Sequence, residues 1–167
     1  MKQFFLLLIM LLLFSCNPFY YQYQRLNENL PKSKFYLEQQ SLLKPLLKKE
    51  NEPFILIISW DKSILSQENM TYKALVYYPK NGSKKLLETR KKTPKNIISS
   101  DLTDKNFYDF KFILDNYLEG KEEYLLSLHD SFSSSEVNSP YYIYDFVINK
   151  KIKLKSFTFD KDGKIIQ

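Results

Sequence analysis

The sequence predicts an α+β domain in which a mostly antiparallel sheet carries helices packed on one face. Three observations lead to this fold class. Segments with helical and with strand-like spacing follow one another in the order helix, strands, helix, strands; neighbouring strand-like segments are joined by connections of hairpin length; and no internal repeat is present. The 44% hydrophobic content, with 13 Phe and 13 Tyr, also argues against disorder over most of the chain.

The first predicted helix covers residues 34–49. Pro45 is expected to kink it or to start a second segment, and its leucines recur at helical spacing: Leu37, Leu42, Leu43, Leu46 and Leu47. The preceding residues 17–33 are rich in Tyr, Gln and Asn and have no sustained apolar period, so we interpret them as a tether. After Pro53, the short apolar run 54–58 predicts a buried strand.

A β-hairpin is predicted next. Its strands, residues 70–78 and 84–90, are separated by Pro79 and the dipeptide Asn81-Gly82. Asn-Gly is typical of tight reversals because both residues tolerate the positive φ that such a turn requires. A charged connection, rich in lysine, then leads to the clearest helix of the chain.

That helix is predicted from about residue 104 to 119. Thr103 suits the N-cap, Asp104 favours the positive helix end, and Gly120 suits the C-terminal cap. The apolar residues advance by three or four positions and lie on one face: Phe107, Phe110, Leu114, Tyr117 and Leu118. Such a stripe predicts that the helix packs on the sheet.

The last part of the chain is predicted to consist mainly of strands. They cover residues 124–128, 141–148 and 151–159, with a serine-rich loop at 131–140, a turn near Asn149, and a turn at Asp162-Gly163 before a short terminal strand. Within 151–159 the apolar phase changes, because Ile152 and Leu154 lie on the face opposite to Phe157 and Phe159. We expect a bulge at that point.

Glycine is scarce, which excludes several classes of site. Gly82, Gly120 and Gly163 are the only glycines, and each already has a predicted turn or cap role. A Walker loop or a dinucleotide-binding fingerprint needs several glycines for close backbone approach to phosphate. The chain also has no HExxH or paired CxxC pattern and only one histidine. We therefore predict no catalytic, cofactor-binding or metal-binding residues and no cofactor.

Three groups of polar or charged residues resemble functional sites, and a structural role explains each of them better. His129, Asp130 and Ser131 stand in succession, but adjacent strand side chains point apart and no Gly-x-Ser-x-Gly elbow is present. Residues 160–163 resemble the opening of a calcium loop, yet a hairpin turn explains them better. Asp115 and Glu119 share a helical face with a lysine one turn earlier, which indicates solvated ion pairing.

The N-terminus has the layout of an export signal. Lys2 precedes an unbroken apolar run from Phe4 to Phe14, and Ser15 and Cys16 follow directly. As a helix this run would reach only about 16 Å at about 1.5 Å per residue, whereas a bilayer core is about 30 Å thick. The segment is therefore too short to span a membrane comfortably.

The end of this signal, Leu13-Phe14-Ser15-Cys16, resembles the lipobox of bacterial lipoproteins. The resemblance covers residues 1–16 and implies that the Cys16 thiol receives a diacylglyceryl group, that a peptidase cuts after Ser15, and that the new amine is often acylated, for example with palmitate. Cys16 is the only cysteine, so acylation also explains a lone thiol in an exported protein. We expect a signal peptide at 1–15, a lipidated cysteine and tether at 16–33, and one α+β domain at 34–167.

The same resemblance bears on location. In Gram-negative lipoproteins an Asp directly after the cysteine tends to retain the protein at the inner membrane, and this chain has Asn17. The expectation is therefore a cell-envelope protein held by lipid at the periplasmic face of the outer membrane in a Gram-negative cell. In a Gram-positive cell the same anchor would lie on the outer leaflet of the plasma membrane. Removal of Lys2 with the signal lowers the formal net charge from +6 to +5, because 24 Lys and Arg then face 19 Asp and Glu.

Two basic clusters are the remaining surface features, Lys84 to Lys95 and Lys150 to Lys164, the second interleaved with Phe157 and Phe159. We interpret them first as wet strand faces and protected sheet edges, and otherwise as contacts for a protein or an anionic envelope partner rather than nucleic acid. We interpret Tyr141, Tyr142 and Tyr144 as core residues, rather than as side chains that stack on sugars or line a protein contact.

The sequence thus favours a membrane-anchored lipoprotein that acts as a non-enzymatic binding module. The competing hypotheses are an envelope hydrolase acting on carbohydrate or peptide, with carboxylates or His129, and an immunity or inhibitor lipoprotein. A deep pocket with converging polar side chains would favour the enzyme, whereas a flat aromatic and basic patch would favour the binding module.

Overall fold

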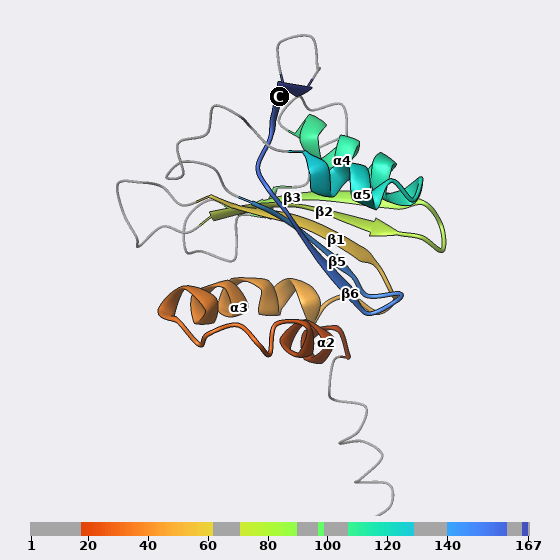
Figure 1. Cartoon of the computed structure of the whole chain (residues 1–167). Helices are drawn as coiled ribbons and strands as arrows, with labels where there is room; N and C mark the ends of the chain where they lie inside the picture. Colours follow the sequence, from red (N-terminus) through yellow and green to blue (C-terminus); the bar gives the residue numbers. More distant parts are fainter. Residues whose placement is uncertain are drawn as a thin grey trace, which may run out of the picture. The chain divides into compact units, whose positions relative to one another are not determined.

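The computed structural model describes residues 18–61, 71–89, 97–98, 107–128, 140–159 and 165–166 (Figure 1). The chain forms two compact units, Met1–Asn51 and Glu52–Gln167. The first unit contains the helices α2 (Pro18–Leu26) and α3 (Lys34–Leu47), and the second contains the sheet together with α4 and α5.

In the first unit, helix α3 confirms the helix predicted over residues 34–49. Its N-terminus is capped by Ser33, whose side chain accepts a hydrogen bond of 3.2 Å from the Tyr36 backbone N–H. Pro45 lies inside the helix and does not end it. Leu37 is exposed, however, and Tyr36 takes its place in the buried stripe with Leu43, Leu46 and Leu47.

Helix α2 was not expected, because residues 17–33 were interpreted as a tether. Phe19 and Tyr23 are the buried residues of this helix, four positions apart and therefore on one face. Two aromatic residues are too few to show a period in the sequence, which explains why the helix was missed. That the segment acts as a spacer from a membrane stays a prediction.

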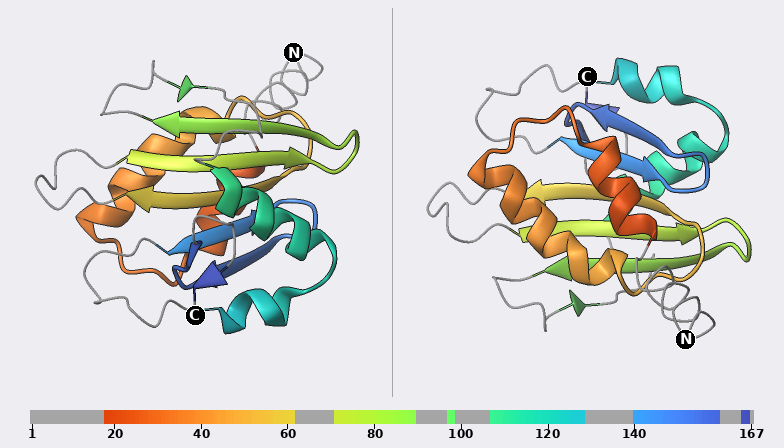
Figure 2. Two further views of the ribbon diagram at one scale, coloured as in Figure 1. Left: turned by 90° about the horizontal axis from the view of Figure 1, so that it is seen from above. Right: turned by 90° about the horizontal axis from the view of Figure 1, so that it is seen from below.

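The second unit is built on a six-stranded sheet, and all of its strand pairs are antiparallel, as predicted (Figure 2). The strand order is β4-β3-β2-β1-β5-β6, with β1 (Ile55–Asp61), β2 (Thr71–Tyr78), β3 (Ser83–Thr89), β4 (Ile97–Ile98), β5 (Tyr141–Asp145) and β6 (Lys150–Leu154). The apolar run after Pro53 forms β1, which lies between β2 and β5. The predicted hairpin is β2–β3.

The turn of that hairpin has the predicted geometry. Gly82 has φ 71°, in the left-handed region that favours glycine. Its N–H donates to the Tyr78 carbonyl over 2.9 Å, and the Ser83 N–H donates to the Asn81 side-chain oxygen over 2.9 Å. The Asn-Gly dipeptide therefore fixes both the backbone reversal and its local hydrogen bonds.

Helices α4 (Tyr108–Leu118) and α5 (Glu122–Ser127) pack on one face of the sheet, which confirms the predicted α+β arrangement (Figure 2). The core between them contains apolar residues from strands of the sheet and from both helices. Its members include Ile55, Ile57, Leu75, Leu86, Ile143, Ile152, Phe110, Ile113, Leu114 and Leu125. Alternate strand residues supply the sheet side of this core, as the period of two requires.

Helix α4 confirms most of the prediction for residues 104–119. Gly120, with φ 74°, follows its C-terminus as expected. The helix begins at Tyr108, and Thr103 and Asp104 lie outside the described residues. Ile113 belongs to the buried stripe in addition to Phe110 and Leu114, whereas Leu118 is exposed.

The strand predicted at residues 124–128 is wrong, because this segment is the helix α5. Glu122 and Glu123 stand in its first turn, where carboxylates interact favourably with the helix dipole. Leu125 is fully buried while Leu126 is exposed. The next buried residue is Leu128, three positions after Leu125, which is helical rather than alternating spacing.

The predicted strands 141–148 and 151–159 are both shorter in the structure. The first ends at Asp145, and the second divides into β6 and β7 (Thr158–Phe159). Strand β7 pairs with β8 (Ile165–Ile166) in a separate two-stranded sheet. The change of apolar phase before Phe157 therefore marks the end of a strand and not a bulge.

Candidate interaction surface

One end of the sheet brings together two hairpin turns and the end of a helix. Ile55, the first residue of β1, pairs with Tyr77 on one side and with Asp145 on the other. The β2–β3 turn (residues 79–82) and the β5–β6 turn (residues 146–149) therefore lie at the same end (Figure 1). Helix α4 reaches this end too, because the Tyr117 hydroxyl hydrogen-bonds to Asp145.

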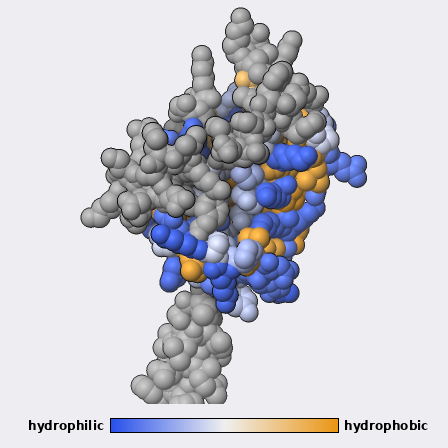
Figure 3. Space-filling model, turned by 60° about the vertical axis from the view of Figure 1, so that its left-hand side comes forward, coloured by the Kyte–Doolittle hydropathy of each residue, from blue (hydrophilic) through white to orange (hydrophobic). Residues whose placement is uncertain are grey.

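This end carries exposed apolar side chains. Val147 and Ile148, in the β5–β6 turn, expose 52% and 63% of their surface. Leu118, next to Tyr117 at the end of α4, is exposed as well. We call Val147, Ile148 and Leu118 the turn-end surface. On the side of the molecule drawn in Figure 3, by contrast, hydrophobic residues form small areas interrupted by hydrophilic ones.

The β5–β6 turn is held in place by Asp145, which is itself buried. One oxygen of its carboxylate accepts hydrogen bonds from the Val147 and Ile148 backbone N–H groups, over 2.8 and 3.2 Å. The other oxygen accepts from the Tyr117 hydroxyl over 2.8 Å. Burial, and then the hydrogen bond to Asp145, raise the pKa of Tyr117, so the hydroxyl stays a donor.

Two further features fix the backbone of the turn. Asn149 adopts φ 56°, a left-handed conformation that Asn tolerates better than most residues. The Phe146 N–H donates to the Phe54 carbonyl over 3.0 Å, and the two rings lie 4.6 Å apart between centroids. The backbone that carries the exposed Val147 and Ile148 side chains is therefore held in one conformation.

Two acidic groups near this surface, Glu119 and Glu122, form ion pairs with lysines. Lys150 contacts Glu122 of α5, which joins strand β6 to that helix, and Lys121 lies 2.6 Å from Glu119. Lys80 and Lys84 are exposed around the β2–β3 turn. Exposed ion pairs of this kind add little stability.

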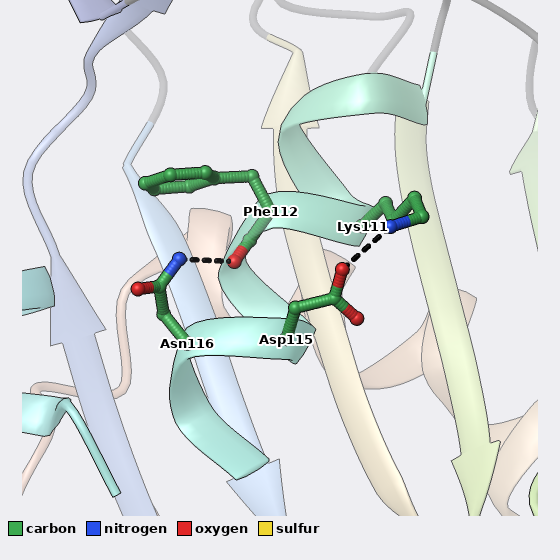
Figure 4. A network of polar contacts seen from close by, with 4 residues as sticks. All are labelled: Lys111, Phe112, Asp115 and Asn116. Carbon is green, nitrogen blue, oxygen red and sulfur yellow. Dashed lines mark hydrogen bonds and ion pairs between the residues drawn. The ribbon is translucent and has the colours of Figure 1, made fainter. Parts of the chain in front are cut away.

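Earlier in α4, the expected solvated ion pair between Lys111 and Asp115 is confirmed. The Lys111 Nζ lies 2.6 Å from the Asp115 Oδ2 on the exposed side of the helix, and the two residues are one turn apart (Figure 4). The Asn116 side-chain N–H donates to the Phe112 carbonyl over 2.9 Å. These contacts belong to the helix itself and converge on no other element.

A second polar cluster lies at the opposite end of the sheet. Ser59 of β1 pairs with Lys73 of β2 and with Tyr141 of β5, so the three share one face. The Tyr141 hydroxyl donates to Asp109, which also accepts from the Phe110 N–H over 2.9 Å. Burial raises the pKa of Asp109, and the hydrogen bonds and the Lys73 charge oppose that rise.

The tyrosines singled out in the sequence divide between the two faces of the sheet. Tyr141 and Tyr144 are buried, which confirms the core interpretation for both, and Tyr142 is half-buried. Lys151, from the second basic cluster, places its ammonium 5.6 and 5.7 Å from the ring centroids of Tyr142 and Tyr144. Burial, and then Lys153, lower the pKa of Lys151.

The sequence predicted none of the residues that build the turn-end surface. Val147 and Ile148 belonged to a predicted strand, and Asp145 had no assigned role. The available signal was Asp145 placed four residues before Asn149, because both residue types favour turns. Cys16, His129, Asp130, Ser131 and residues 160–163 lie outside the described residues.

Other kinds of site find no support in the part of the chain that the structure describes. Within the described ranges, no group of His, Cys, Asp and Glu side chains is placed to hold a metal ion. In the same part of the chain, no helix combines the length and apolar character of a membrane span. Comparison with protein-family models, curated proteins and solved structures found no match for this chain.

Proposed function

We propose that this protein is an exported bacterial lipoprotein whose folded part acts as a non-enzymatic binding module at an envelope membrane. The observation that carries the proposal is the sequence Leu13-Phe14-Ser15-Cys16 at the end of a short apolar run. Each buried methylene of an attached lipid contributes about 0.8 kcal/mol, so a protein with two or three acyl chains stays on the bilayer. Asn17 favours the outer membrane in a Gram-negative cell.

The geometry of the second unit supports binding over hydrolysis. Among the described residues of this unit, Asp145 is buried and Asp109 is half-buried, and both carboxylates accept hydrogen bonds from tyrosine hydroxyls and backbone N–H groups. A general acid or base must instead reach a substrate atom. The rigid apolar turn of the turn-end surface has the character of a contact site.

The test compares the full-length protein with a Cys16→Ser variant in a bacterial host fed an alkyne-tagged fatty acid. We expect the unaltered protein to take up the tag, to lose residues 1–15 and to sediment with membranes. The Cys16→Ser protein should carry no tag and should remain in the soluble fraction or unprocessed. Cys16→Ser combined with Ser41→Cys, which places a thiol on an exposed part of α3, should also stay untagged.

Two outcomes would contradict the proposal. One is a Cys16→Ser protein that lacks residues 1–15 and is still bound to membranes as firmly as the unaltered protein. The other is mass spectrometry of the unaltered protein that finds an intact Met1 end or a free thiol at Cys16.

A further inference from the structure

We infer that the β5–β6 turn is a second membrane contact, in which Val147 and Ile148 enter the headgroup region of a phospholipid bilayer. The inference rests on the proposed lipid anchor and adds a site to it. Two adjacent aliphatic side chains, each more than half exposed, gain free energy when they leave water. Their place at the tip of a hairpin makes the surface convex, which suits a soft lipid layer better than a protein pocket.

The hydrogen bonds of the turn favour entry into lipid. A backbone N–H that loses water in the bilayer must find another acceptor, which normally opposes insertion of a loop. Here the N–H groups of Val147 and Ile148 already donate to the Asp145 carboxylate. The two residues can therefore leave water without leaving these donors unsatisfied.

The path of the chain places the turn at the attached end of its unit. The second unit starts at Glu52, and Phe54 directly contacts Phe146 through a backbone hydrogen bond and its ring. A single residue, Asn17, separates Cys16 from the start of α2. A lipid on Cys16 keeps the bilayer at high effective concentration around the chain, so even a weak contact is occupied.

The charges around the turn permit this contact. Lys80 and Lys84 are exposed on the neighbouring hairpin, whereas Lys150, which follows the turn, pairs with Glu122. The long stems of Lys80 and Lys84 allow their ammonium groups to reach phosphate while the apolar tip enters the interface. Glu119 and Glu122 pair with lysines, and Glu123 is the further exposed carboxylate on α5, so acidic groups do not dominate this end.

The experiment places a fluorophore at the tip. Cys16 is the only cysteine and its thiol is blocked by lipid under the proposed function, so Ile148→Cys in the lipidated protein offers one reactive thiol. The labelled protein is reconstituted into vesicles of phosphatidylcholine and phosphatidylglycerol that contain brominated acyl chains. Tyr108→Cys is the matched control, because Tyr108 is also half exposed but begins α4 at the other end of the unit.

We expect brominated lipid to quench the label at position 148 at least about twofold more than the label at position 108, and iodide in water to show the opposite order. Equal quenching by lipid at both positions would overturn the inference. A label at position 148 that is shielded from iodide but not quenched by lipid would indicate a protein partner and would overturn it too. Labelling of the protein without an introduced cysteine would instead refute the lipid on Cys16.

Discussion

The carboxylate of Asp145 accepts hydrogen bonds from three donors. Its two oxygens accept from two backbone N–H groups of the following turn and from the hydroxyl of Tyr117 in α4. Hydrogen bonds to a charged acceptor are stronger than neutral ones, and a buried carboxylate that loses a donor keeps its desolvation cost. This residue therefore couples the shape of the β5–β6 turn to the position of the helix.

Removal of the Tyr117 hydroxyl should expose this coupling. We expect Tyr117→Phe to lower the free energy of unfolding by about 1–2 kcal/mol, because one donor to a buried carboxylate is lost. Tyr124→Phe, at an exposed tyrosine of α5, should change it by less than about 0.5 kcal/mol. Urea unfolding followed by circular dichroism measures both. Equal effects of the two substitutions would mean that the contact with Asp145 contributes no stability.

At the scale of elements, α5 offers a direct check on the helix that replaced a predicted strand. Leu125 is fully buried in the core, and its neighbour Leu126 is 45% exposed. We expect Leu125→Ala to lower the free energy of unfolding by about 2–5 kcal/mol and Leu126→Ala by less than about 0.5 kcal/mol. A strand with Tyr124, Leu126 and Leu128 on its inner face would reverse this order, which the same unfolding experiment would detect.

The elements that the sequence predicted correctly have strong local signals. Asn81-Gly82 supplies the backbone conformation of its own turn, and the stripe through Phe110 and Leu114 extends over enough turns to show a helical period. The elements that it missed are short or aromatic. Helix α5 has six residues, and α2 buries only Phe19 and Tyr23, so neither gives a recognisable period.

The turn-end surface was harder to predict for a different reason. Residues 146–148 are apolar, and composition alone cannot distinguish a buried strand from an exposed turn. The exposure of Val147 and Ile148 depends on the hydrogen bonds to Asp145 and on the left-handed Asn149, which are tertiary and conformational features. Lipidation of Cys16 depends on local sequence alone and stays a prediction.

At the scale of the whole molecule, Asp109 makes stability depend on pH. Burial raises its pKa above the ordinary value of 3.8, so protonation is easier in the folded state than in the unfolded one. Its contribution to stability is therefore greatest below about pH 4 and is lost as the pH rises through the raised pKa.

Asp109→Asn should remove this loss, because an amide oxygen still accepts from Tyr141 without a desolvated charge. Urea unfolding at pH 3.5 and pH 7 should show that the variant gains stability relative to the unaltered protein as the pH rises. The control is Asp115→Asn, which alters an exposed ion pair with Lys111 and should show no such gain. If the relative stability of Asp109→Asn instead falls between these two pH values, the pKa of Asp109 is lowered by folding and not raised.

The pairing of β1 on both of its sides also sets the order in which the chain can fold. Ile57 lies beside Leu75, which follows soon in the sequence, and beside Ile143, which is synthesised much later. During synthesis β1 can therefore pair only with β2 until β5 has emerged from the ribosome. Bringing β5 to β1 closes a long loop, which is slow. The nascent chain therefore stays unfolded for longer than a chain whose contacts are local. Such a delay is compatible with the proposed export, in which the polypeptide would cross a translocation channel before it folds.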